Sequence, residues 1–294
     1  MCGIFALYAP KRSEGARHAM LSALTRTLKH RGPDHQGEWH DPSAPFGLGQ
    51  RRLAIVDLSP DGQQPMRSRS GRYIVSFNGE IYNFGTLRDE LRARGVAFRG
   101  RSDTEVLLAA IEEWGLNTTC QRINGMFAII LYDQQERRLH LIRDRFGKKP
   151  LYFGWAGSDF ICASELKPFL AHPEFSRTIA RPALSQYLKF GWIPAPYSIF
   201  ESVRMVLPGC RLMIGLDDIQ THNPLFAPMD SYWSPARVVD EAMTHTAALA
   251  KMPYADRVLE TERVIEESVR DRCVADVPLG AFLSGGIDSS TVVA

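Results

Sequence analysis

The order of apolar and polar residues along the first two-thirds of the chain predicts many short strands with helices grouped between them. An apolar run at residues 4–8 predicts a buried strand that begins almost at the first residue. Residues 16–29 carry apolar side chains at helical spacing, and Gly32 and Pro33 follow as residues that end a helix. Two more helices are predicted over residues 86–94 and 104–114, stopping at Gly95 and Gly115. Further strands are predicted at residues 47–57, 72–77, 126–132, 139–143, 151–155 and 160–163.

This grouping decides between two fold classes. Strict alternation of strand and helix would indicate a parallel sheet, whereas strands gathered between helices indicate stacked sheets with helices on their outer faces. The first two-thirds of the chain is of the second kind. An α+β fold is therefore expected.

The last third has a different organisation. A short helix is predicted at residues 183–190, and a proline-rich connection follows at residues 193–196. Residues 217–253 show little periodicity and hold four prolines, which is typical of a linker or long loop. The pattern then restarts with a helix at residues 255–273, a short apolar strand at 278–283 and a glycine-rich loop that opens another helix. We therefore expect a domain over residues 2–190, a connecting segment over 191–253, and the start of a second domain over 254–294.

Composition narrows the protein class. The 294 residues are 45% hydrophobic and 23% charged with a net charge of +2, which is typical of a globular protein and gives no sign of a nucleic-acid or membrane surface. The five cysteines show no C-x-x-C spacing, so neither a disulfide framework nor a zinc site is expected, and a reducing cytoplasm fits best. No apolar run is long enough to span a bilayer, and no basic region precedes the first apolar run as it would in a signal peptide.

Cys2 is the first candidate catalytic residue. The initiator methionine is normally removed before a residue as small as cysteine, which would leave a free α-amine beside the thiol. An α-amine has an unperturbed pKa of about 7.7–8.0, so it can accept the thiol proton near neutral pH and later protonate a departing ammonia. On its position alone, Cys2 reads equally well as a small buried residue at the start of a strand.

Three other segments carry groups that an amide-hydrolysing thiol needs. Residues 77–83 read as a strand ending in an Asn78-Gly79 turn, whose side-chain amide and backbone N–H can stabilise an oxyanion, with the Glu80 carboxylate beside them. Arg52 can bind an α-carboxylate, and Asp103 at a helix start can pair with an α-ammonium. Taken singly, these residues read as a hairpin turn, a surface arginine and a helix cap. Together they indicate a free amino acid with a side-chain amide, either glutamine or asparagine.

A glycine-rich loop near the C-terminal end is a candidate for phosphate binding. Residues 284–290 read Ser-Gly-Gly-Ile-Asp-Ser-Ser, between a predicted strand and a predicted helix. Glycines allow close backbone approach and a helix N-terminus favours an anion, although the spacing differs from a Walker loop. The alternative is a glycine-rich turn with a serine helix cap.

These motifs, in this order, resemble the glutamine-hydrolysing asparagine synthetases. The resemblance rests on Met-Cys-Gly-Ile-Phe at 1–5, His-Arg-Gly-Pro-Asp at 30–34, Arg-Leu-Ala-Ile-Val-Asp at 52–57, Phe-Asn-Gly-Glu-Ile-Tyr-Asn at 77–83 and Ser-Asp-Thr-Glu at 102–105. Segments 143–152 and 163–167 are similar to that family as well. The resemblance implies a class II glutamine amidotransferase domain with an N-terminal-nucleophile hydrolase αββα sandwich, followed by an incomplete α/β segment of the ATP-pyrophosphatase type.

The resemblance also implies roles for individual residues. Cys2 is expected as the nucleophile, and Asn78 and Gly79 as the oxyanion hole. The residues expected to bind glutamine are Arg52, Leu53, Ile55, Asn78, Glu80 and Asp103, with Arg51 less favoured than Arg52. Those expected to bind ATP are Leu283, Ser284, Gly285, Gly286, Asp288, Ser289 and Ser290, with Asp288 a candidate for Mg²⁺. The intact enzyme would use glutamine, aspartate, ATP and Mg²⁺, its glutaminase step would need no cofactor, and a homodimer is one expected assembly.

The chain departs from the family in its length. Synthetases of this type continue for a few hundred residues beyond the glycine-rich loop, so residues after about 254 are expected to be an incomplete unit that folds loosely and binds ATP weakly. Two alternatives to asparagine synthesis stay open at this point. One is a class II amidotransferase that serves a different adenylated acceptor, and the other is a non-catalytic glutamine-binding fragment.

Overall fold

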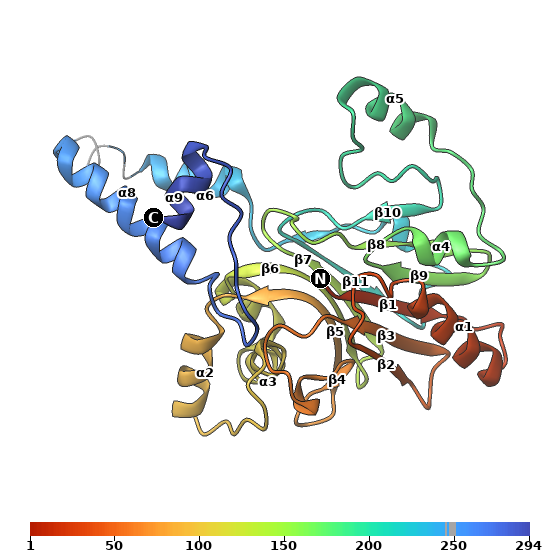
Figure 1. The fold of residues 1–294 in the computed structure, drawn as a ribbon. Helices are drawn as coiled ribbons and strands as arrows, with labels where there is room; N and C mark the ends of the chain where they lie inside the picture. The colour runs from red at the N-terminus through yellow and green to blue at the C-terminus, as the bar shows by residue number, and fades with distance from the viewer. Residues whose placement is uncertain (245, 247–250) are drawn as a thin grey trace.

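Two antiparallel sheets lie face to face in the computed structural model, which describes residues 1–244, 246 and 251–294 (Figure 1). Within these residues each sheet has six strands. The first sheet runs in the order β10 (Val203–Met205), β8 (Tyr152–Ala156), β9 (Asp159–Ala163), β1 (Gly3–Tyr8), β3 (Phe46–Arg52) and β2 (His35–His40). The second runs in the order β12 (Asp230–Ser231), β11 (Cys210–Gly215), β7 (Arg138–Arg143), β6 (Gly125–Asp133), β5 (Tyr73–Ile81) and β4 (Met66–Arg67).

Helices cover the outer face of each sheet. On the first sheet, α1 (Glu14–Arg26) buries Leu21 and Leu24 against Phe5 and Leu7 of β1. On the second, α2 (Phe84–Ala93) and α3 (Asp103–Arg122) pack their apolar faces onto β5 and β6. The core between the sheets is formed by inward-facing residues such as Leu48 and Ile130. The layers are therefore helix, sheet, sheet, helix, as the sequence predicts.

The strands differ from their predicted bounds at two places that matter for the site. The predicted strand at 47–57 ends at Arg52, and residues 53–57 form a loop. The predicted end of a strand at Phe77 is wrong, because β5 continues through Asn78 and Gly79 to Ile81. Asn78 pairs with Ala128 and Gly79 with Phe127, so pairing with β6 replaces the expected Asn-Gly turn.

Gly79 lies in β5 for a steric reason. A β-carbon at this position would lie 2.2 Å from the carbonyl oxygen of Met126 and 2.6 Å from the α-carbon of Phe127. Only glycine lets β5 and β6 approach this closely.

The helix predicted over residues 104–114 extends beyond its predicted end. Gly115 has a left-handed backbone with φ of +78°, and this residue interrupts the helix as predicted. The chain then resumes a helical course, so α3 as a whole reaches Arg122. Ser102 caps its start through a hydrogen bond from the Glu105 N–H, which fixes Asp103 in the first turn.

Residues 191–253, expected as a connection, supply strands to both sheets. β10 pairs with β8, and β11 pairs with β7. Leu212 and Ile214 of β11 are buried in the core between the sheets. Shorter elements in the described part of the chain are α4 (Lys167–Ala171), α5 (Arg181–Phe190), α6 (Pro235–Met243) and the 3₁₀ turns η1 (Pro60–Gly62) and η2 (Pro224–Phe226).

The C-terminal part lies to one side of the two sheets (Figure 1). It holds α8 (Tyr254–Arg270) and α9 (Ile287–Val293), which the sequence predicts. The predicted strand at 278–283 is absent, because no strand lies beside this segment in the described part of the chain, and Phe282 is fully exposed. Among the described residues, none of the helices combines the length and apolar character that crossing a membrane requires.

Candidate active site

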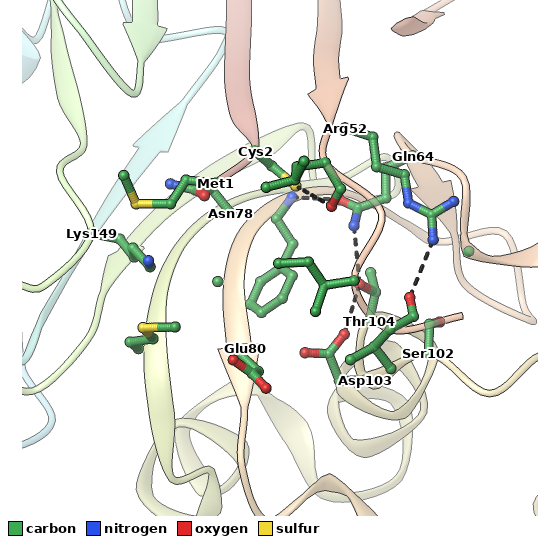
Figure 2. A pocket seen from close by; sticks show the side chains of 17 residues that line it. Met1, Cys2, Arg52, Gln64, Asn78, Glu80, Ser102, Asp103, Thr104 and Lys149 are labelled. Carbon is green, nitrogen blue, oxygen red and sulfur yellow. Dashed lines mark hydrogen bonds between the residues drawn. The ribbon is translucent and has the colours of Figure 1, made fainter. Parts of the chain in front are cut away.

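A cavity of about 90 Å³ lies where β1 and β3 of the first sheet meet β5 of the second (Figure 2). The structure brings all the residues expected for glutamine hydrolysis to this one cavity: Cys2, Arg52, Leu53, Ile55, Asn78, Gly79, Glu80 and Asp103. They come from four separate segments of the chain, and the two-sheet arrangement is what gathers them.

Cys2 enters the cavity at the start of the first strand. Its Sγ donates a weak hydrogen bond to the Leu53 carbonyl at 3.7 Å, and burial raises the pKa of the thiol. Arg31 donates from Nε to the Cys2 carbonyl at 2.9 Å and is itself paired with Glu165 at 2.8 Å. The chain before β1 is therefore held in place by a charged side chain from the 30–34 motif.

Met1 lines the same cavity and carries the α-amine in this chain. Burial lowers the pKa of this amine, which favours its neutral, proton-accepting form. In the absence of Met1, the amine would belong to Cys2 and lie next to the thiol. The Met1 amine and the Cys2 thiol already lie close enough for the charge of each to affect the pKa of the other, and removal of the methionine would place both groups on one residue.

Asn78 presents an unusual buried amide. The residue is 1% exposed, and neither its Nδ2 nor its Oδ1 has a hydrogen-bond partner among the residues that the structure describes. Leaving a buried polar group unpaired costs about 1–3 kcal/mol, so native proteins rarely keep one without a use. Figure 2 shows this amide beside Cys2, where a donor would meet the oxyanion formed by thiol attack.

Arg52 and Arg51 point to different places. Arg52 lines the cavity and donates from Nη1 to the Ser59 carbonyl at 3.4 Å, and from Nη2 to the carbonyls of Val56 and Asp57. Arg51 instead donates to the Gly32 carbonyl at 2.9 Å and to Gln36. Only Arg52 is placed to meet a ligand, and its remaining N–H groups are free for a carboxylate.

Two carboxyl groups make the opposite wall of the cavity. Burial raises the pKa of Asp103 to about 6, although its Oδ2 accepts a hydrogen bond from the Ile81 N–H at 3.0 Å. Burial and the neighbouring Asp103 raise the pKa of Glu80 to about 6. Two desolvated carboxylates that repel one another favour a cation between them, and an α-ammonium group supplies that charge.

Sequence reasoning missed several residues of the cavity. Gln64 accepts from the Phe77 N–H at 2.7 Å and donates to Thr104 at 3.0 Å, which ties β5 to the start of α3. Lys149 is buried beside Cys2, and its ammonium has no hydrogen-bond or ion-pair partner among the described residues. Burial lowers the pKa of Lys149. The Arg-Asp-Arg-Phe-Gly-Lys-Lys motif at 143–149 was the available signal for Lys149, whereas Gln64 stood in no motif.

The glycine-rich loop forms a turn ahead of α9. Ser284 and Ser289 bond through their hydroxyls at 3.0 Å, and Gly285 takes a φ of +78°. The residues expected to bind ATP are exposed at the surface, with partial burial only at Ser289: Leu283, Ser284, Gly285, Gly286, Asp288, Ser289 and Ser290. The described residues hold no cluster of three metal-ligating side chains. A lone Asp288 carboxylate suits Mg²⁺ only where phosphate oxygens complete the coordination.

Comparison with known families agrees with this geometry. The glutamine amidotransferase domain family matches residues 1–226, and the asparagine synthase family matches residues 260–294. A solved structure of glutamine phosphoribosylpyrophosphate amidotransferase from Bacillus subtilis, complexed with ADP and GMP, superposes with a TM-score of 0.56 at 18% identity. That superposition covers 79% of this chain and 49% of the other, and it shows the fold.

Curated relatives match along the whole chain. Asparagine synthetase [glutamine-hydrolyzing] 3 of Bacillus subtilis is 34% identical over 100% of this chain and 45% of its own length. A putative asparagine synthetase of Mycobacterium tuberculosis is 36% identical with the same two coverages. Amidase chry2 of Gibberella zeae is 32% identical over 99% of this chain and 42% of its own length.

The chain spans less than half the length of these relatives. The match over residues 1–226 takes in both sheets and every residue of the cavity. The chain belongs to the glutamine amidotransferase domain family, built on the two-sheet N-terminal-nucleophile hydrolase fold, with a C-terminal segment related to asparagine synthase.

Proposed function

We propose that this chain hydrolyses glutamine with the Cys2 thiol and that the ammonia serves the synthesis of asparagine from aspartate. The observation that carries the proposal is the unpaired Asn78 amide beside Cys2, in a cavity that also holds one guanidinium and two carboxyl groups. The position of this amide supports an oxyanion role, because an unpaired buried donor beside the thiol is available to an oxygen atom of the bound substrate.

The geometry supports a specific sequence of steps. Removal of Met1 leaves the Cys2 amine to accept the thiol proton, and the thiolate attacks the side-chain carbonyl carbon of glutamine. The Asn78 Nδ2 stabilises the oxyanion, and the ammonium of Cys2 protonates the amide nitrogen as ammonia leaves. Water then hydrolyses the thioester to glutamate and restores the thiol.

Glutamine fits the cavity by charge at both ends of its backbone. Arg52 binds the α-carboxylate, while Glu80 and Asp103 face the α-ammonium. These contacts hold the side-chain amide toward Cys2. They exist in the bound substrate and in the transition state alike, so they set KM more than kcat.

The acceptor is proposed from the C-terminal segment. Residues 260–294 match asparagine synthase, and relatives named asparagine synthetases match the whole chain. The loop at residues 284–290 would hold ATP, and the Asp288 carboxylate would be available to bind Mg²⁺. ATP would supply the activation of the aspartate carboxyl group. The match to an amidase favours a second candidate, an amidotransferase of the same class with a different acceptor.

Two measurements test these proposals separately. Glutamate released from glutamine without ATP tests the hydrolytic step, and mass spectrometry of the same sample reports whether Met1 has been removed. Transfer of amide-labelled nitrogen from glutamine to aspartate, with Mg²⁺ present and ATP well above its Kd, tests the acceptor. Glutaminase activity with labelled nitrogen in another product would support the second candidate.

The raised pKa values of Glu80 and Asp103 predict opposite effects of pH on binding and on stability. As pH falls through about 6, both groups take up protons and lose attraction for the α-ammonium, so KM for glutamine should rise. The folded state holds these protons at pH values where the unfolded chain has released them. The free energy of unfolding should therefore fall as pH rises from about 4 to 6, and then level off.

The Asp103→Asn variant is the control for this prediction. It keeps an oxygen for the Ile81 N–H but carries no charge. KM for glutamine should be higher at every pH and depend less on pH between about 5 and 7. The fall in the free energy of unfolding between about pH 4 and 6 should be smaller than in the wild type. A KM that is independent of pH in the wild type would contradict the assignment of these carboxylates to the ammonium.

ATP should bind weakly to a polypeptide of these 294 residues. The loop is exposed, and no described strand lies beside residues 278–286 to hold its glycines. Isothermal titration should give a Kd above about 1 mM, with the glutaminase reaction unaffected by ATP. Micromolar binding would show that this loop is organised without a neighbouring strand.

A further inference from the structure

The segment after α8 returns to the glutamine cavity. Figure 1 shows the chain between α8 and α9 reaching down toward the sheets before it turns back to α9. Within this segment, the Asp276 N–H donates to the Ile55 carbonyl at 2.9 Å, and the Asp276 Oδ2 accepts from the Asp57 N–H at 2.8 Å. One residue of the asparagine synthase match therefore makes two hydrogen bonds to loop 53–57.

Loop 53–57 forms one wall of the cavity. Leu53, Ile55 and Val56 line it, and the Leu53 carbonyl accepts the hydrogen bond from Cys2. The loop belongs to no strand, so it lacks the ladder of hydrogen bonds that fixes β3 just before it. Its position depends on the few contacts made by its own backbone groups.

Asp57 connects Asp276 to the glutamine-binding arginine. Its carbonyl accepts a hydrogen bond from Arg52 Nη2, and its amide donates to Asp276. The Asp57 backbone has a φ of +58°, a conformation that residues other than glycine rarely adopt without outside support. Its carboxylate accepts hydrogen bonds from the N–H groups of Ser59 and Arg101. These bonds and the bond from its amide to Asp276 support the left-handed conformation.

A second contact anchors the same segment. The Arg272 guanidinium lies over the Tyr82 ring at 4.4 Å from its centroid. Tyr82 follows β5 directly, two residues after Glu80. The segment thus contacts loop 53–57 through Asp276 and the residue that follows β5 through Arg272.

We propose that Asp276 is a positioning residue for glutamine binding, which acts through Asp57 to hold the Arg52 guanidinium toward the substrate carboxylate. The inference rests on the proposed glutaminase function. It assigns to the segment that matches asparagine synthase a direct part in glutamine hydrolysis. It follows that movement of this segment changes the affinity of the cavity for glutamine.

The test is a comparison of three variants of the 294-residue chain. Asp276→Ala should raise KM for glutamine about three- to tenfold and leave kcat within about twofold, because a contact common to bound substrate and transition state is weakened. Asp276→Asn keeps an acceptor for the Asp57 amide and should restore KM. Asp271→Ala is the matched control, since in the described part of the chain the Asp271 side chain has no hydrogen-bond or ion-pair partner and its backbone N–H donates to the Glu267 carbonyl.

A double-mutant cycle separates positioning from a general structural effect. In an Arg52→Ala background, Asp276→Ala should add little to the rise in KM, because the arginine through which it acts is gone. Fully additive effects would overturn the proposed route through Arg52. An active wild type with unchanged KM in Asp276→Ala would overturn this inference alone, whereas a wild type without glutaminase activity would overturn the proposed function and this inference with it.

Discussion

Replacing Cys2 by alanine is expected to abolish glutamine hydrolysis, lowering kcat/KM by at least about 10³-fold. The thiol supplies the bond-forming atom, and no other cysteine lines the cavity, so nothing replaces it. The fold should be unaffected, because within the described residues the Cys2 side chain makes only one weak hydrogen bond. Glutamate release measured without ATP checks the result.

Two controls sharpen this prediction. Cys273→Ala removes an exposed free thiol outside the cavity and should leave the rate unchanged. A chain with an uncleaved N-terminal extension should be as inactive as Cys2→Ala, because its α-amine lies far from the thiol. Full activity in either the Cys2→Ala chain or the extended chain would rule out a mechanism based on an N-terminal nucleophile.

Replacing Asn78 by alanine should lower kcat by about 10²–10³-fold with a much smaller change in KM, as expected when an oxyanion donor is lost. Its effect on stability should be small or favourable. The amide is buried and unpaired, so its removal takes away a group that costs about 1–3 kcal/mol in the folded state. A glutaminase assay and a denaturant titration on the same protein measure the two effects.

Asn83 offers a matched comparison for Asn78. Its side chain donates to the Arg122 carbonyl at 3.0 Å and accepts from the Asn124 N–H at 2.8 Å, outside the cavity. Asn83→Ala should therefore lower the free energy of unfolding by about 1–3 kcal/mol and leave kcat nearly unchanged. If Asn78→Ala lost stability instead of rate, its amide would be a structural group and the oxyanion assignment would be wrong.

Gly79 is a poor choice for the same kind of experiment. A side chain there would collide with the backbone of β6, so Gly79→Ala would disturb the pairing of β5 and β6. Loss of activity in that variant would not distinguish an oxyanion donor from a displaced strand. Substitution at Asn78 leaves the strand pairing in place.

The elements that sequence predicted well are those with a local signal. The apolar run at 4–8 and the helical spacing in α1 and α2 each correspond to an observed element. The errors arose where distant partners decide the structure. Asn78-Gly79 has a strong turn signal, but nine residues of β6 opposite it extend the strand instead. The apolar segment 278–283 has strand composition, yet no described strand lies beside it.

The same reasoning applies to the cavity. The residues that the motifs assign to glutamine hydrolysis, such as Cys2, Arg52 and Asp103, lie in the cavity. Gln64 and Asp276 had no such signal, since their importance comes from hydrogen bonds to residues 13 and 219 positions away. Contacts over such distances follow from the fold of the whole chain and cannot be read from local patterns.

Cys2 and Asn78 belong to different sheets, which meet through contacts such as the hydrogen bond from Gln50 to the Phe77 carbonyl at 3.0 Å. The cavity therefore comes into existence only when the two halves of the sandwich close on each other. Glutaminase activity is thus a built-in reporter of folding, which registers the docking of the two sheets without an added dye.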